Sequence, residues 1–259
     1  EYKSECHHGT AYTKMIADYS DIHSEVRYYV PLNKTYEVWN LILTNNSKQA
    51  RSLNVTGYAE FTNNSNYEQD QVNLQYSQYI TQTVFVENRV RQMIHANLDQ
   101  IEEGKEVDNK DVVNRFLGLA GSKVSSWCGD KEEFLGRYHG YGNPTGVETG
   151  ELNNHGNYNE NGCGAITTTI ELAPGESRTI AFIVGMIDNK EAGKIVNLYA
   201  DTKAVCDREL EELITYWHGQ LSHFQIKTPS DEFNTMINTW NAYNCFMTFI
   251  WSRAASFTY

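Results

Sequence analysis

The sequence predicts a mainly β protein, in which a large antiparallel β-sandwich of two sheets is followed by α-helices. Apolar and polar residues alternate through much of residues 11–187, as they do in strands with one buried face. Turn sequences separate these runs and no helical pattern lies between them, which favours antiparallel pairing. Near Asp201 the apolar residues change to spacings of three and four, which is typical of amphipathic helices.

Two pairs of runs look like β-hairpins. The first joins EVWNLIL at 37–43 to RSLNVTGYAEF at 51–61 through a polar turn, and the second joins AITTTIEL at 165–172 to RTIAFIVGMI at 178–187 through APGES. Asn and Ser in the first connection and Pro-Gly in the second favour tight turns. Shorter strands are expected at 79–86, 115–120 and 134–138.

Two helices are expected after residue 200. The first covers about residues 202–224, and the second begins with Thr228 as N-cap, Pro229 as first helical residue and Asp231 in the first turn. The second helix is apolar on nearly all sides, so it must be buried between neighbours. We therefore expect residues 1–200 to form the sandwich and residues 201–259 to form a helical linker and the start of a helical domain that continues beyond this chain.

The net charge and the lack of a long apolar run limit the kinds of partner that this protein can bind. The chain has 259 residues and a formal net charge of -12, so nucleic acid and anionic membrane surfaces are repelled on average and are not expected to bind. No run approaches the roughly 20 apolar residues that a membrane span needs. The first residues, EYKSECHHG, contain neither an initiator Met nor a signal peptide, and we expect the chain to begin within a longer protein.

Cysteine usage indicates a cytoplasmic protein with reduced thiols, because the cysteines are odd in number and widely separated. They are Cys6, Cys128, Cys163, Cys206 and Cys245. No metal site is expected at CHH, residues 6–8, because adjacent strand residues point to opposite faces. The Asn-x-Ser/Thr sequences are interpreted as turn and strand-end residues rather than as glycosylation sites. They begin at Asn33, Asn45, Asn54 and Asn63.

Catalytic motifs are absent from the sequence. It contains no GxSxG, no HExxH and no P-loop. The Gly- and Asn-rich segment 139–164 is interpreted either as an ordered functional loop or as a simple connection. Within it, His139 and His155 are the histidines that we would test for function.

The strongest binding candidate is QDQVNLQYSQYI at 69–80, which is expected as a polar strand. Its candidate sugar-binding residues are Asn73, Gln75, Tyr76 and Gln78. Planar amides offer paired hydrogen-bond donors and acceptors to sugar hydroxyls, and aromatic rings stack on the C–H faces of sugars. A polar strand face without any ligand is the alternative interpretation.

A series of motifs in order along the chain resembles one enzyme family. The motifs are CHHGTAYTK, YYVPLN, VWNLILTNNS, NLQYSQY, FLGRYHGYGNP, LAPGES and MINTWNAYNCFMTFIWSRAAS. Together they are similar to the N-terminal part of the cellobiose, laminaribiose and chitobiose phosphorylases of glycoside hydrolase family 94.

This resemblance implies a cytoplasmic homodimer with a galactose-mutarotase-like super-sandwich, a helical linker and an (α/α)6 barrel. Members cleave a β-linked glucose disaccharide or a related one with inorganic phosphate, inverting the anomeric centre to give an α-sugar 1-phosphate and a free sugar. An Asp in the barrel is the general acid and phosphate is the nucleophile, so no second carboxylate is needed. On this resemblance the chain holds no catalytic residue, needs no cofactor besides phosphate as co-substrate, and depends on the remaining barrel as its partner.

The resemblance places residues 73–78 on the acceptor side of the active site. Cellobiose-specific members resemble Asn-Tyr-Gln-Arg-Asn here, whereas this chain has Tyr76 in place of the Arg. A phenol does not replace the fork of donors on a guanidinium, so a β-1,3 linkage ranks slightly ahead of β-1,4, and a GlcNAc disaccharide follows. The remaining alternatives are a stand-alone carbohydrate-binding sandwich and a dimerisation domain without catalysis.

Overall fold

A computed structural model describes residues 3–61, 72–94 and 114–251, and it confirms a mainly β fold with two antiparallel sheets. Within these residues the larger sheet has eight strands in the order β1-β2-β3-β4-β11-β8-β7-β6, and the smaller has three in the order β5-β10-β9. The strands are β1 (Lys3–Gly9), β2 (Tyr12–Tyr19), β3 (Ile22–Tyr29), β4 (Tyr36–Asn45), β5 (Arg51–Glu60), β6 (Thr81–Val86), β7 (Arg89–Ile94), β8 (Arg115–Ala120), β9 (Ser126–Asp130), β10 (Gly162–Leu172) and β11 (Ser177–Met186).

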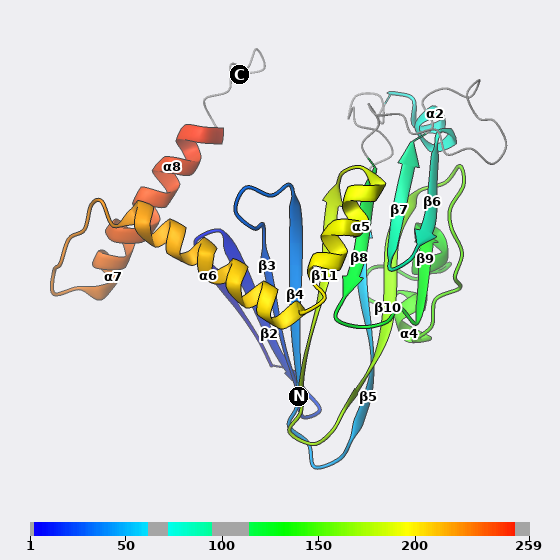
Figure 1. Ribbon diagram of the computed structural model, residues 1–259, viewed down its shortest axis with the longest axis horizontal. Helices are drawn as coiled ribbons and strands as arrows, with labels where there is room; N and C mark the ends of the chain where they lie inside the picture. The colour runs from blue at the N-terminus through cyan, green and yellow to red at the C-terminus, as the bar shows by residue number, and fades with distance from the viewer. Residues whose placement is uncertain (1–2, 62–71, 95–113, 252–259) are drawn as a thin grey trace.

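The sheets stack into layers with separate cores. Between the sheets lies a cluster of aliphatic and aromatic side chains that includes Leu117, Ile166 and Phe182. The other face of the large sheet is covered by α5 (Asn189–Leu198) and α6 (Thr202–Leu221) (Figure 1). The other face of the small sheet is covered around α3 (Lys131–Leu135), whose Phe134 is buried there.

The two expected hairpins are wrong, because each connection crosses between the sheets. β4 pairs with β3 and β11 in the large sheet, whereas β5 pairs with β10 in the small one. β10 and β11 likewise lie in different sheets. Alternation of apolar and polar residues is the same for a strand in either sheet, so the local pattern does not distinguish a hairpin from a corner of the sandwich.

The Asn45 side chain connects the two corners at which the chain crosses between the sheets, from β4 to β5 and from β10 to β11. Its Nδ2 donates to the carbonyl of Gln49 at 2.7 Å in its own corner, and to those of Leu172 at 3.1 Å and Ala173 at 3.2 Å in the other. The side chain is fully buried, which leaves no room for a glycan on its nitrogen. Asn63, another of the four Asn-x-Ser/Thr positions, lies outside the described residues.

Two of the three shorter strands are confirmed as β6 and β8, whereas the strand expected at 134–138 is wrong. Helix α3 occupies its first half and ends at Gly136, which has a positive φ of 83°. The Asp130 side chain accepts from the backbone N–H of Glu133 at 3.0 Å and thereby caps the helix. Asp followed by acidic residues is a helix-start signal that the strand interpretation overlooked.

The first helix of the C-terminal part is confirmed as α6, which is fastened to the large sheet. Its Cys206, Leu213 and Trp217 are buried in the core on that face. The hydroxyls of Tyr29 and Tyr199 donate to the Glu209 carboxylate at 3.2 Å and 2.7 Å. Burial raises the pKa of Glu209 and outweighs these two donors, which lower it.

The second helix begins later than expected, because Ser230 rather than Thr228 is the N-cap. The Ser230 hydroxyl accepts from the N–H of Phe233 at 3.2 Å. The helix then runs as α7 (Asp231–Thr235), a π-helical stretch, residues 236–241, and α8 (Ala242–Trp251). Several of its large apolar side chains are exposed, among them Phe233, Met236, Phe249 and Ile250. In the part of the chain that the structure describes, no helix is long and apolar enough to span a bilayer.

Candidate functional site

The predicted sugar-binding residues lie on a short helix rather than on the expected strand. Gln75, Tyr76 and Gln78 belong to α2 (Leu74–Tyr79), and Asn73 precedes it. No β-branched residue occurs between 73 and 79, so the side-chain restriction that lowers helix propensity is absent from this segment. Asn73 and Gln75 are exposed and Gln78 is half-buried, while the side chain of Tyr76 lies outside the described residues.

Gln78 connects α2 to the Gly- and Asn-rich segment. Its Nε2 donates to Oδ1 of Asn161 at 3.1 Å, and its backbone carbonyl accepts from the Thr81 hydroxyl at 3.0 Å. The two stretches that the sequence analysis singled out separately are therefore in contact. No hydrogen bond from any other residue in the described ranges reaches the Oε1 of this amide, so that oxygen is left for other partners.

Residues 154–159, which we call the bridging segment, tie the free edges of the two sheets together. The carbonyl of Asn157 accepts from the N–H of Thr83 on β6 at 3.0 Å, and the carbonyl of His155 accepts from the N–H of Gly129 on β9 at 2.8 Å. β6 and β9 are the outermost strands of their sheets on this side. Unpaired sheet edges invite association with other chains, and the bridging segment occupies both.

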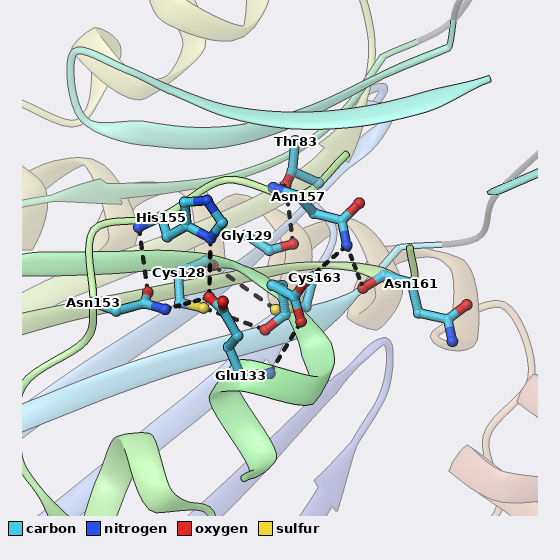
Figure 2. A network of polar contacts seen from close by, with 10 residues as sticks. Thr83, Cys128, Gly129, Glu133, Asn153, His155, Asn157, Asn161 and Cys163 are labelled. Carbon is cyan, nitrogen blue, oxygen red and sulfur yellow. Dashed lines mark hydrogen bonds and ion pairs between the residues drawn. The ribbon is translucent and has the colours of Figure 1, made fainter. Parts of the chain in front are cut away.

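The Thr83 hydroxyl is the centre of this connection (Figure 2). It donates to the carbonyl of Gly129 at 2.9 Å and accepts from the N–H of Asn157 at 2.6 Å. A Cβ added at Gly129 would lie 2.2 Å from Thr83 Oγ1, and one at Gly156 would lie 2.3 Å from the Thr83 carbonyl oxygen. These glycines let the backbones of β9 and the bridging segment approach Thr83 closely.

The Asn157 side chain extends the network toward Gln78. Its Nδ2 donates to Oδ2 of Asp130 at 3.2 Å and to the carbonyl of Asn161 at 3.3 Å. Asp130 uses its other carboxylate oxygen to cap α3. The bridging segment, the cap of α3 and Asn161 are thus held as one unit (Figure 2). Asn161 in turn accepts the hydrogen bond from Gln78.

A charged and aromatic cluster adjoins Asn161. The N–H of Lys131 donates to the Asn161 carbonyl at 3.1 Å, and its Nζ lies 3.2 Å from Oε1 of Glu60 and 5.5 Å from the ring centre of Tyr141. Burial opposes ionisation of Glu60, but hydrogen bonds from Tyr141, Lys131 and Tyr58 outweigh burial and lower its pKa. Glu60 is therefore a carboxylate at neutral pH.

The two histidines of the Gly- and Asn-rich segment have separate partners. His155 Nδ1 lies 3.0 Å from Oε2 of Glu133, and the Asn153 amide donates to the same oxygen. The His139 ring contacts the Asn143 carbonyl at 2.9 Å instead. Both histidines are exposed and no nucleophilic hydroxyl or thiol is hydrogen-bonded to either in the described part of the chain, so the arrangement does not resemble a catalytic triad.

The side chains exposed at this end of the sandwich are of kinds that bind ligands rather than catalyse reactions. Exposed amides, a Lys–carboxylate pair and the largely exposed rings of Tyr138 and Tyr141 are suited to polar, ring-shaped ligands such as sugars. Among the described residues, no group of three or more His, Cys, Asp or Glu side chains is placed to hold a metal ion. Sequence analysis missed Asn157, Asn161 and Lys131, because isolated Asn and Lys residues in a loop carry no spacing signal.

The fold is a two-sheet sandwich followed by helices, and comparison with known proteins identifies its family. The profile of the glycosyl hydrolase 94 supersandwich domain matches residues 1–202, and that of the glycosyl hydrolase 94 superfamily catalytic domain matches residues 216–259. The chain therefore belongs to glycoside hydrolase family 94.

Several curated relatives are similar to this chain in sequence. The chain is 29% identical to an N,N'-diacetylchitobiose phosphorylase of Vibrio proteolyticus over 99% of its own length, and 29% identical to the same enzyme of Vibrio furnissii over 98%. It is 26% identical to a 3-O-beta-D-glucopyranosyl-beta-D-glucuronide phosphorylase of Paenibacillus borealis over 91%. The chain covers only 30%, 30% and 29% of the length of these three relatives, respectively.

Replacing Gly156 by Ala is expected to destabilise the protein by about 1–3 kcal/mol, because the new methyl group overlaps the Thr83 carbonyl oxygen. Gly140→Ala is the matched control in the same Gly- and Asn-rich segment, since its Cβ would meet nothing within 4 Å. Its effect on the free energy of unfolding should stay within about 0.5 kcal/mol. Urea unfolding of both variants measures the difference. Equal stabilities would show that the bridging segment is not held against β6.

Proposed function

We propose that the chain is the N-terminal part of an inverting disaccharide phosphorylase. The observation that carries this proposal is the succession of two family matches in one chain, the supersandwich domain first and the catalytic domain after it. The exposed apolar side chains of α7 and α8 support it, because they suit burial against further helices of a catalytic barrel. In this proposal residues 1–200 are the sandwich, residues 201–259 are the linker and the start of the barrel, and the catalytic Asp lies beyond residue 259.

The proposed reaction is the cleavage of a β-linked disaccharide by inorganic phosphate. Phosphate attacks the anomeric carbon while the barrel Asp protonates the glycosidic oxygen, and the products are an α-sugar 1-phosphate and a free sugar. Phosphate is the co-substrate and no further cofactor takes part. The proposed enzyme is a cytoplasmic homodimer, and neither nucleic acid nor a membrane is a partner.

The choice of disaccharide follows from the relatives and from α2. Two relatives are named for N,N'-diacetylchitobiose and one for a 3-O-β-glucosyl glucuronide, so phosphorolysis is common to them and the sugar is not. Tyr76 in place of an Arg argues against cellobiose. We propose a β-1,3-linked glucose disaccharide first, with the β-1,4 and GlcNAc disaccharides as the compounds to test beside it.

The second candidate function is a stand-alone carbohydrate-binding or dimerisation sandwich. The exposed Gln75 and the cluster around Glu60, Lys131 and Tyr141 favour sugar binding without catalysis. This alternative gives no role to the exposed apolar side chains of α7 and α8, which would face water.

The longer protein should release sugar 1-phosphate from laminaribiose, cellobiose or N,N'-diacetylchitobiose only when inorganic phosphate is present. The 259-residue chain alone should release none, because the residues that bind phosphate and protonate the leaving group belong to the barrel. Ion chromatography of the products measures both. Hydrolysis without phosphate would contradict the proposed reaction, and disaccharide binding by the isolated chain would support the second candidate function.

Tyr76→Phe in the longer protein is expected to raise KM for the acceptor sugar in the synthetic direction about 3- to 10-fold, which corresponds to one lost hydrogen bond. We expect kcat to stay unchanged, because the substitution does not affect the chemical step. Tyr79→Phe is the matched control at the exposed end of the same helix and should leave KM unchanged. Identical kinetics for both variants would remove Tyr76 from the acceptor site.

A further inference from the structure

Two cysteines that are 35 positions apart in the sequence lie together in the structure. Cys128 on β9 and Cys163 on β10 are buried in the cluster between the small sheet and α3. Cys163 Sγ lies 3.8 Å from the carbonyl oxygen of Cys128, and both side chains belong to the same buried cluster. Figure 2 shows both sulfur atoms beneath the bridging segment.

An irregularity in strand pairing brings the two side chains to the same face. Asp130 pairs with Gly162 and Cys128 with Ala165, so β10 has one residue more than β9 over this stretch. Such a bulge turns side chains that would otherwise be further apart along the strands toward each other.

One of the two thiols borders a hollow that opens to solvent. Cys128 lines a cavity of about 520 Å³ together with Glu133, Thr145, Leu152 and Asn153. The hydrogen bond from Cys163 lowers the pKa of Cys128 against the effect of burial, whereas the neighbouring Cys128 and burial raise the pKa of Cys163. The thiol that borders the hollow is therefore the more acidic and the more nucleophilic of the pair.

From this geometry we infer that Cys128 and Cys163 are a redox-active dithiol, a covalent modification site in which a small peroxide entering the hollow oxidises the pair to a disulfide between β9 and β10. The inference is independent of the proposed carbohydrate chemistry. It also departs from the sequence-based expectation of scattered, unpaired thiols.

The chemistry balances with hydrogen peroxide as the oxidant. The Cys128 thiolate attacks one peroxide oxygen, the O–O bond breaks, and the departing hydroxide takes a proton and leaves as water, which gives a sulfenic acid. The Cys163 sulfur then attacks the Cys128 sulfur, the S–O bond breaks, and the hydroxyl group leaves as water with the Cys163 proton. The two thiols lose two electrons and the peroxide is reduced to two waters.

Treatment of the protein with hydrogen peroxide, followed by non-reducing peptide mapping, tests the inference. The Cys128 peptide should shift from unlinked to mostly linked with the Cys163 peptide, and dithiothreitol should reverse the link. The oxidised protein should melt about 5 °C higher, because the disulfide closes the loop that contains α3, α4 (Thr145–Glu148) and the bridging segment.

Cysteine variants provide the controls. Cys163→Ala should abolish both the linked peptide and the rise in melting temperature, whereas Cys206→Ala, at the other buried cysteine, should retain both. Over-oxidation of Cys128 beside an unmodified Cys163 would overturn the inference, as would oxidation confined to the exposed Cys6 and Cys245. If Cys163→Ala does not fold, mapping of the unaltered protein still decides between these outcomes.

Discussion

A single buried hydroxyl holds together the side of the sandwich that carries the candidate site. Thr83 on β6 donates to Gly129 on β9 and accepts from Asn157 in the bridging segment. A hydroxyl is suited to this position because it donates once and accepts at the same time. Loss of the hydroxyl would leave a buried N–H and a buried carbonyl unpaired, which costs about 1–3 kcal/mol for each group.

The contact between Gln78 and Asn161 depends on this connection. The hydroxyl fixes the backbone at Asn157, and the Asn157 amide then reaches Asp130 and the Asn161 carbonyl. Asn161 in turn holds Gln78 on α2. The Gly- and Asn-rich segment is therefore an ordered part of the sandwich, and its small residues are explained by the close approach of backbones around Thr83. The dithiol lies beneath the bridging segment, and its oxidation would link β9 to its neighbour β10 in the small sheet.

The sequence predicted the fold class, the position of most strands and the first C-terminal helix, because each depends on periodic burial of apolar residues. It did not predict which strands share a sheet, since a corner such as the one held by Asn45 and a hairpin turn have the same local composition. It placed Gln78 among the candidate residues but not its partner Asn161, because contacts between distant polar residues leave no periodic trace. The same reason explains why Cys128 and Cys163 looked unrelated.

The central claim is that the bridging segment is as firmly held as the sheets that it joins. Native-state hydrogen exchange of the Asn157 and Gly129 amides measures this directly, since both are hydrogen-bonded only across the junction. The account predicts exchange within about tenfold of the amides of β6 and β9, because the junction opens only when these strands separate. Exchange at Asn157 as fast as in an exposed loop would contradict it.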